Sequence, residues 1–175
     1  MFGSYFYHSA IRRTIAVFGT LFNNINIRKS DANGKILQEI KVPLAYGPRS
    51  KFLARVQNQA DLSDSKLAIK LPRMSFEITS ITYDTNQTVN KSNEVRVGSI
   101  TTNSRNSVRA PAPYRVGIQL NIMAKNQDEA LQILEQILPT FKPDYTVTIN
   151  EVPAIGIKSD IPIVLQGVAM NDDYE

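Results

Sequence analysis

The chain has 175 residues with 20 basic and 16 acidic side chains, a formal net charge of +4 and a hydrophobic share of 42%. This length suits one domain with a real core, and so mild a charge excess, spread along the sequence, does not by itself indicate a nucleic-acid binder. Cysteine is absent, which excludes disulfides and thiolate metal sites, and without a signal-peptide pattern or an apolar run near ~20 residues we expect a soluble protein made in the cytosol.

The first expected element is a helix over residues 3–24. Its apolar side chains recur every three to five residues, whereas Arg12 and Arg13 lie off that stripe. The aromatic side chains at the start of this helix either pack on the protein's own sheet or anchor the chain against another subunit, because aromatic residues and arginine are enriched at interfaces. These aromatic residues are Phe2, Tyr5, Phe6 and Tyr7.

A β-hairpin is predicted next, with one strand beginning at Ile25 and the other at Ile36. Asn33-Gly34 lies between them, and Asn-Gly is the strongest short hairpin signal. Pro43 and then Gly47-Pro48 are expected to end the second strand.

A short helix over residues 49–58 follows, with its apolar residues turned inward. Arg49, Lys51 and Arg55 fall on its outer side. Such a basic helix face is usually only solvated, and the functional alternative is a contact with an acidic partner surface.

The strand from Met74 to Tyr83 changes its phase of alternation, so the sequence predicts a β-bulge near Thr79-Ser80. Residues 84–112 are then rich in Asn, Ser and Thr. Structureless loops beyond ~12–15 residues are uncommon in compact domains unless they are functional or disordered. Because residues 94–101 still alternate, we expect a projecting hairpin arm that docks on a neighbour, with plain disorder as the alternative.

The centre of the chain is a strand over residues 114–122, with one apolar and one polar face, followed by an amphipathic helix. Asn126 is at the expected N-cap, and Glu129 is placed to complete a capping box. Prolines at 139 and 143 predict that the helix ends between residues 138 and 142.

Two further strands are expected, over residues 145–149 and 161–168, the second buried on both faces because it is almost continuously apolar. The predicted fold class is therefore α+β. A mixed, mostly antiparallel sheet packs against the N-terminal helix and the central amphipathic helix, and a polar arm projects at about residues 84–112. Residues 1–175 are expected to form a single domain.

No catalytic arrangement is visible in the sequence. His8 is the only histidine, so histidine metal clusters and Cys/His catalysis are excluded. The acidic pairs at 61/64, 128/129 and 172/173 fall in a loop, at a helix start and in a tail, and neither phosphate-binding glycine motif occurs. We expect no enzyme activity, no cofactor and no metal.

Several blocks of the sequence, in their order and spacing, resemble the tail-completion and sheath-stabiliser family of T4-like contractile-tailed phages, also called tail terminators. The resemblance covers essentially the whole chain. Family members are typically longer, with at least one more strand after the equivalent of Val168. The blocks are Met1-Phe2-Gly3 with Tyr5-Phe6-Tyr7 and Arg12-Arg13, Val42 to Tyr46, Leu71-Pro72-Arg73, Glu135 to Pro143, and Asp160 to Leu165.

This resemblance implies a structural virion protein rather than an enzyme. Such proteins form a hexameric ring at the head-proximal end of the tail, cap the tail tube and the last ring of tail sheath, and offer a docking surface to the neck. DNA passes through the ring without sequence-specific binding. The family has no catalytic residues to carry over.

Cyclic rings need heterologous contacts, in which two different patches of each subunit meet. The alternative is a nucleic-acid-binding or packaging accessory protein that uses the arginines of the arm. The candidate subunit or partner interface comprises Phe2, Tyr5, Phe6, Tyr7, Arg12, Arg13, Arg49, Lys51, Arg55, Arg96, Arg105 and Arg109.

Overall fold

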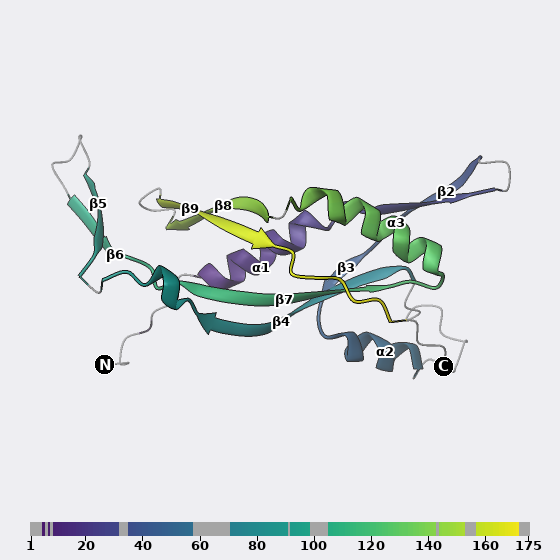
Figure 1. Cartoon of the computed structure of the whole chain (residues 1–175), viewed down its shortest axis with the longest axis horizontal. Helices are drawn as coiled ribbons and strands as arrows, with labels where there is room; N and C mark the ends of the chain where they lie inside the picture. Colours follow the sequence, from purple (N-terminus) through teal and green to yellow (C-terminus); the bar gives the residue numbers. More distant parts are fainter. Residues whose placement is uncertain are drawn as a thin grey trace.

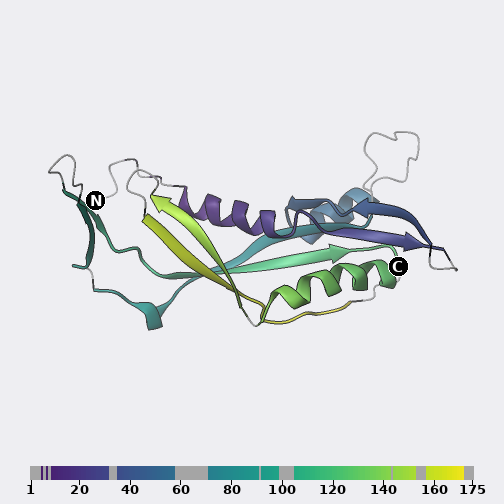
Figure 2. The same ribbon diagram turned by 90° about the horizontal axis from the view of Figure 1, so that it is seen from above.

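The computed structural model describes residues 5, 7, 9–31, 35–57, 71–90, 92–98, 105–142, 144–152 and 157–171. The described part is elongated (Figure 1). A two-stranded hairpin projects at each end, and the helices and the longest strands lie between them. A second view, turned by 90°, shows the same elongated arrangement (Figure 2).

A three-stranded sheet runs through the middle of the molecule in the order β3 (Leu44–Tyr46), β4 (Arg73–Tyr83) and β7 (Tyr114–Met123). β3 is parallel to β4, and β7 is antiparallel to it. The register between β4 and β7 shifts between Ile78 and Ser80, which confirms the bulge that the change of phase predicts.

Two helices cover one face of this sheet, α1 (Ala10–Leu21) and α3 (Gln127–Ile137). The buried core lies between these helices and the sheet, and its aromatic centre is the contact of Phe18 with Phe76 at 5.3 Å between ring centroids. Residues of even number at the start of β4, Met74 and Phe76, point into this core, as period-two alternation requires.

The helix α2 (Arg49–Gln57) lies on the opposite face of the sheet from α3 (Figure 1). Its Phe52 is buried, and the guanidinium of Arg73 lies 5.2 Å from the centre of that ring. Since Arg73 has the opposite parity to Met74 and Phe76, this contact is on the side of the sheet away from the core.

Three antiparallel hairpins complete the fold. β1 (Asn26–Ser30) pairs with β2 (Ile36–Lys41), β5 (Glu94–Gly98) with β6 (Arg105–Arg109), and β8 (Asp144–Val152) with β9 (Ile157–Val164). Two short 3-10 helices follow β4 and α3, η1 (Thr85–Gln87) and η2 (Leu138–Thr140). The predicted α+β class, with mostly antiparallel strands and two helices packed on a sheet, is confirmed.

Some expected boundaries were wrong. The first helix begins at Ala10 rather than near residue 3, because Ser9 adopts a left-handed conformation with φ of 58°. Residues 161–168 are not a strand buried on both faces: β9 ends at Val164, and Leu165 and Val168 are exposed. The parallel strand β3 was not expected at all.

The predicted capping box at the start of α3 is also wrong. Asn126 is at the N-cap, but its side chain makes no cap hydrogen bond. The carboxylate of Glu129 instead lies 2.9 Å from the Nζ of Lys29 and is buried. Glu129 therefore fastens α3 to β1, a non-local role that a sequence pattern within one helix does not reveal.

Candidate functional site

The root of the arm is held by an ion pair between the end of β4 and the start of β7. The guanidinium of Arg115 donates from Nε to Asp84 Oδ2 at 2.9 Å and from Nη2 to Asp84 Oδ1 at 3.1 Å. The backbone N–H of Asn86 also donates to Asp84 Oδ1, so the same carboxylate caps η1. The Arg115 hydrogen bonds, with that backbone bond, hold the pKa of Asp84 below its usual value, although burial acts in the opposite direction.

The arm beyond this root is the β5–β6 ribbon, which projects from the body in both views (Figures 1 and 2). Its register pairs Val95 with Val108 and Glu94 with Arg109. A two-stranded ribbon by itself is marginally stable in water.

An apolar surface lies between the root and the body, on the same face of β4 and β7 as the core. The bulge keeps Ile81 and Tyr83 on this face, opposite Val116 and Tyr114. The rings of Tyr83 and Tyr114 meet edge to face with centroids 5.6 Å apart, and Ile81, Tyr83 and Tyr114 are all exposed. We call this the root surface, and it is an uncovered continuation of the core face.

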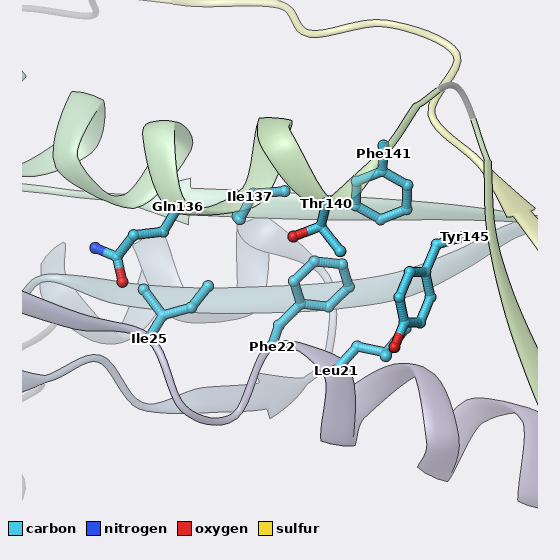
Figure 3. A pocket seen from close by; sticks show the side chains of 8 residues that line it. All are labelled: Leu21, Phe22, Ile25, Gln136, Ile137, Thr140, Phe141 and Tyr145. Carbon is cyan, nitrogen blue, oxygen red and sulfur yellow. The ribbon is translucent and has the colours of Figure 1, made fainter.

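A small pocket opens where the end of α1 meets η2 and the start of β8 (Figure 3). The rings of Phe22, Phe141 and Tyr145 surround it, with Phe22 and Phe141 stacked at 6.3 Å between centroids. Its volume is about 130 Å³. Ligand pockets typically enclose about 300–1,000 Å³, so this pocket is smaller than a typical small-molecule site.

A wider polar groove adjoins this pocket, and Gln136 lines both of them. The groove has a volume of about 540 Å³ and lies between α3 and the β1–β2 hairpin. Its charged residues are Arg28, Glu39 and Glu135. Arg28 Nε lies 3.6 Å from Glu39 Oε2, which leaves Glu135 as an unmatched negative charge in the groove.

The structure places the described candidate interface arginines and lysine on three separate parts of the molecule: α1, the arm and α2. Arg12 and Arg13 are on α1, and Arg96 and Arg109 are on the arm. Arg49, Lys51 and Arg55 lie together on α2, toward the other end of the molecule (Figure 1).

The N-terminal candidates are partly described. Tyr5 is 93% exposed, and Tyr7 and Arg12 are exposed as well. Arg13 is half-buried and donates to the carbonyl of Asn150 on β8 at 3.0 Å, so it supports the fold. Phe2 and Phe6 lie outside the described residues, as does the side chain of Arg105 on β6.

The arginines of the arm do not form a continuous basic surface in the described part of the chain. Glu94 Oε2 lies 3.5 Å from Arg96 Nε, and Glu94 is also directly opposite Arg109 in the register. The nucleic-acid alternative thus gains no specific support and stays a prediction.

Sequence reasoning missed the root surface, the pocket and the Asp84–Arg115 pair. The sequence did contain a signal for the root surface. The apolar residues of β4 switch from even to odd numbers at the bulge, so Ile81 and Tyr83 lie on the same face as the core. Within the described residues, no group of three or more His, Cys, Asp or Glu side chains could hold a metal ion. No helix in the same part of the chain has the length and apolar character to cross a membrane.

Comparison with known proteins gives one family and one curated relative. Residues 5–175 match the family described as T4-like virus Myoviridae tail sheath stabiliser. The chain is 30% identical, over 183 aligned positions, to the tail completion protein gp15 of Enterobacteria phage T4. This alignment covers 98% of the chain but 64% of the relative, so the chain spans less than two thirds of the relative's length.

Proposed function

The chain belongs to the family of T4-like tail sheath stabilisers, and from this premise we propose that it completes a contractile tail by forming a ring at the tail's head-proximal end. Membership of the family makes it a structural component of the virion tail. In the proposed role, a hexameric ring contacts the last ring of tail sheath and the end of the tail tube, and its outer surface receives the neck. DNA passes through the ring during packaging and ejection.

The observation that carries this proposal is the family match over residues 5–175, which includes every described helix and strand. The surfaces of the molecule support an assembly role. The arm has only its own two-stranded ladder, and the root surface beside it leaves Tyr83 and Tyr114 exposed on a face that elsewhere forms the core. Contacts between copies, or with sheath and tube, would cover both features.

The proposal is tested on tails assembled without their completion protein. Adding the purified chain should stabilise the extended sheath and restore joining to heads, and electron microscopy should show a ring at the head-proximal end. A chain that stays monomeric and binds neither tube nor sheath when it is mixed with such tails would refute the proposed role.

The contribution of the arm is tested separately by replacing residues 94–109 with Asn-Gly, a deletion that keeps the Asp84–Arg115 pair at the root of the arm. If the arm makes an essential contact, the deletion variant should fold but lose the ring. Rings of unchanged stoichiometry from this variant would restrict the arm to contacts with sheath, tube or neck.

A further inference from the structure

We propose that neighbouring copies of this chain meet through α2 of one copy and the outer side of α3 of the next. This inference rests on the proposed ring and specifies its subunit contact. The two helices carry opposite charges and lie on opposite faces of the sheet.

The first surface is the basic side of α2. The helix sequence RSKFLARVQ contains three basic residues and no acidic residue. Phe52 holds the helix against the sheet, whereas Lys51 and Arg55, one turn apart, are exposed. Neither makes an ion pair within the described part of the chain.

The second surface is the outer side of α3, whose sequence QDEALQILEQI contains three acidic residues and no basic residue. One side of α3 is used for the protein's own fold. Gln136 Nε2 donates to the carbonyl of Asn26 at 2.8 Å, Gln132 Oε1 accepts from the backbone N–H of Arg28 at 3.1 Å, and Lys29 neutralises Glu129.

These bonds fix which side of α3 is left for a partner. Asp128, Leu131, Glu135 and Leu138 lie at helical spacing on the outer side, and all four are exposed. We call them the acidic stripe. Asp128 accepts a hydrogen bond from Gln132 within the helix. Glu135 forms no ion pair in the described part of the chain, since the nearby Arg28 is paired with Glu39.

The groove beside α3 provides room for basic side chains from a neighbour. It is lined by Glu135 and by the Arg28–Glu39 pair, so its net charge is negative. Long Lys and Arg side chains can place their apolar stems over the exposed leucines of the acidic stripe while their charged ends reach the carboxylates. The room in the groove, its negative charge and the lack of an ion pair for Glu135 in the described part of the chain all favour basic side chains of a neighbouring copy as the occupant.

The placement of the two helices also determines the kind of assembly. In a dimer with a two-fold axis, α2 of each copy would have to contact α3 of the other copy at the same time. This is not possible here, because α2 and α3 lie on opposite sides of the sheet (Figure 1). The contact is heterologous and continues from copy to copy until the rotation closes a ring.

Charge reversal tests this contact in the full chain. The first variant carries Lys51→Glu and Arg55→Glu, and the second carries Asp128→Lys and Glu135→Lys. Each variant alone places like charges at every copy-to-copy contact. We expect the protein concentration for half-assembly to rise by about tenfold or more for each variant alone.

Mixing the two variants gives the decisive result. A copy with an acidic α2 and an acidic α3 then alternates with a copy with two basic helices, so every contact is attractive again. We expect the mixture to recover ring assembly, as measured by sedimentation velocity and native mass spectrometry, with both variants in equal amounts in each ring. The recovered assembly should weaken as salt is raised.

A matched control is Lys35→Glu with Lys158→Glu, which changes the net charge as the first variant does but at exposed positions outside both helices and outside the groove. It should assemble like the wild type, and circular dichroism should show that all variants fold. If wild-type rings form and the reversed variants assemble equally well, or if the mixture is not rescued, the α2–α3 contact is refuted and the ring proposal stands. If the wild type fails to assemble even on tails, both are refuted.

Discussion

The strands β4 and β7 run from the centre of the molecule toward the arm, and their shared face is buried in the centre but exposed near the arm. In the centre, the shared face of β4 and β7 is covered by α1 and α3, and Met74 and Phe76 are buried there. Toward the arm, the same face continues through Ile81 and Tyr83 without a cover. The chain itself therefore covers this face only in part, and the uncovered part is where the proposed assembly contacts would form.

The largest expected difference between these regions comes from truncating one aromatic residue in each. Phe76→Ala should lower the free energy of unfolding by about 3–5 kcal/mol, because it removes a buried ring that contacts Phe18 and Tyr46. Tyr83→Ala, on the same strand and face, should cost less than about 1 kcal/mol in the free protein, since half of its side chain is already exposed. Urea unfolding measures both, and equal losses would contradict the comparison.

The boundary between the two regions is the bulge, and a single methyl group should disturb it. A Cβ at Gly117 would lie 2.5 Å from Ser80 Oγ and 3.0 Å from Thr79 Oγ1. We expect Gly117→Ala to destabilise the protein by about 1–3 kcal/mol through crowding at the point where the register shifts.

Two further variants sharpen this second prediction. Gly167→Ala is the control, because a Cβ there meets nothing within 4 Å, and its effect on the unfolding free energy should be near zero. Ser80→Gly added to Gly117→Ala should recover part of the loss. No recovery would place the cost elsewhere than at the crowded Ser80 side chain.

The bulge also shows what the sequence could and could not predict. Local signals found it, as they found the β1–β2 hairpin from Asn33-Gly34 and the end of α3 from Pro139. These features depend on alternation or on backbone geometry within a few residues, which a single sequence displays directly.

Features that depend on distant residues were missed. β3 pairs in parallel with β4, with Leu44 opposite Met74, and no local pattern encodes that partner. Glu129 was assigned to a capping box because its spacing fits one, but Lys29, a hundred residues away in sequence, provides the stronger charge-assisted contact. For the candidate interface, the sequence indicated the basic side of α2 but could not show that the acidic side of α3 lies across the sheet from it.

At the root of the arm, the Asp84–Arg115 pair should give a pH-dependent contribution to stability. The pKa of Asp84 is lowered from its usual value near 3.8 by its bonds to Arg115. A carboxyl with a depressed folded-state pKa stabilises the native state fully above its unfolded pKa, and this contribution is lost as pH falls through the lower folded value. The unfolding free energies of the wild type and Asp84→Asn should therefore differ at neutral pH, and the difference should begin to shrink near about pH 4 and disappear only below the lowered folded-state pKa of Asp84.

Arg115→Gln provides the reciprocal test, because the same two side chains make the contact. It should show the same convergence at low pH, and combining it with Asp84→Asn should add little further loss, as measured in a double-mutant cycle of urea unfolding. Strictly additive losses would mean that the two residues stabilise the protein independently.

The smallest expected effect on stability comes from removing the arm ribbon. The backbone N–H of Ala110 donates to the carbonyl of Asn93 at 2.9 Å, so residues 94–109 can be replaced by Asn-Gly to close a tight hairpin at that point. The free energy of unfolding should change by less than about 1 kcal/mol, because among the described strands β5 and β6 pair with no other strand than each other. Urea unfolding of the shortened chain checks this value, with wild-type circular dichroism as the criterion for an intact body. A loss as large as that of Phe76→Ala would mean that the arm is part of the core's cooperative unit, and the distinction between a folding region and an assembly region would fail.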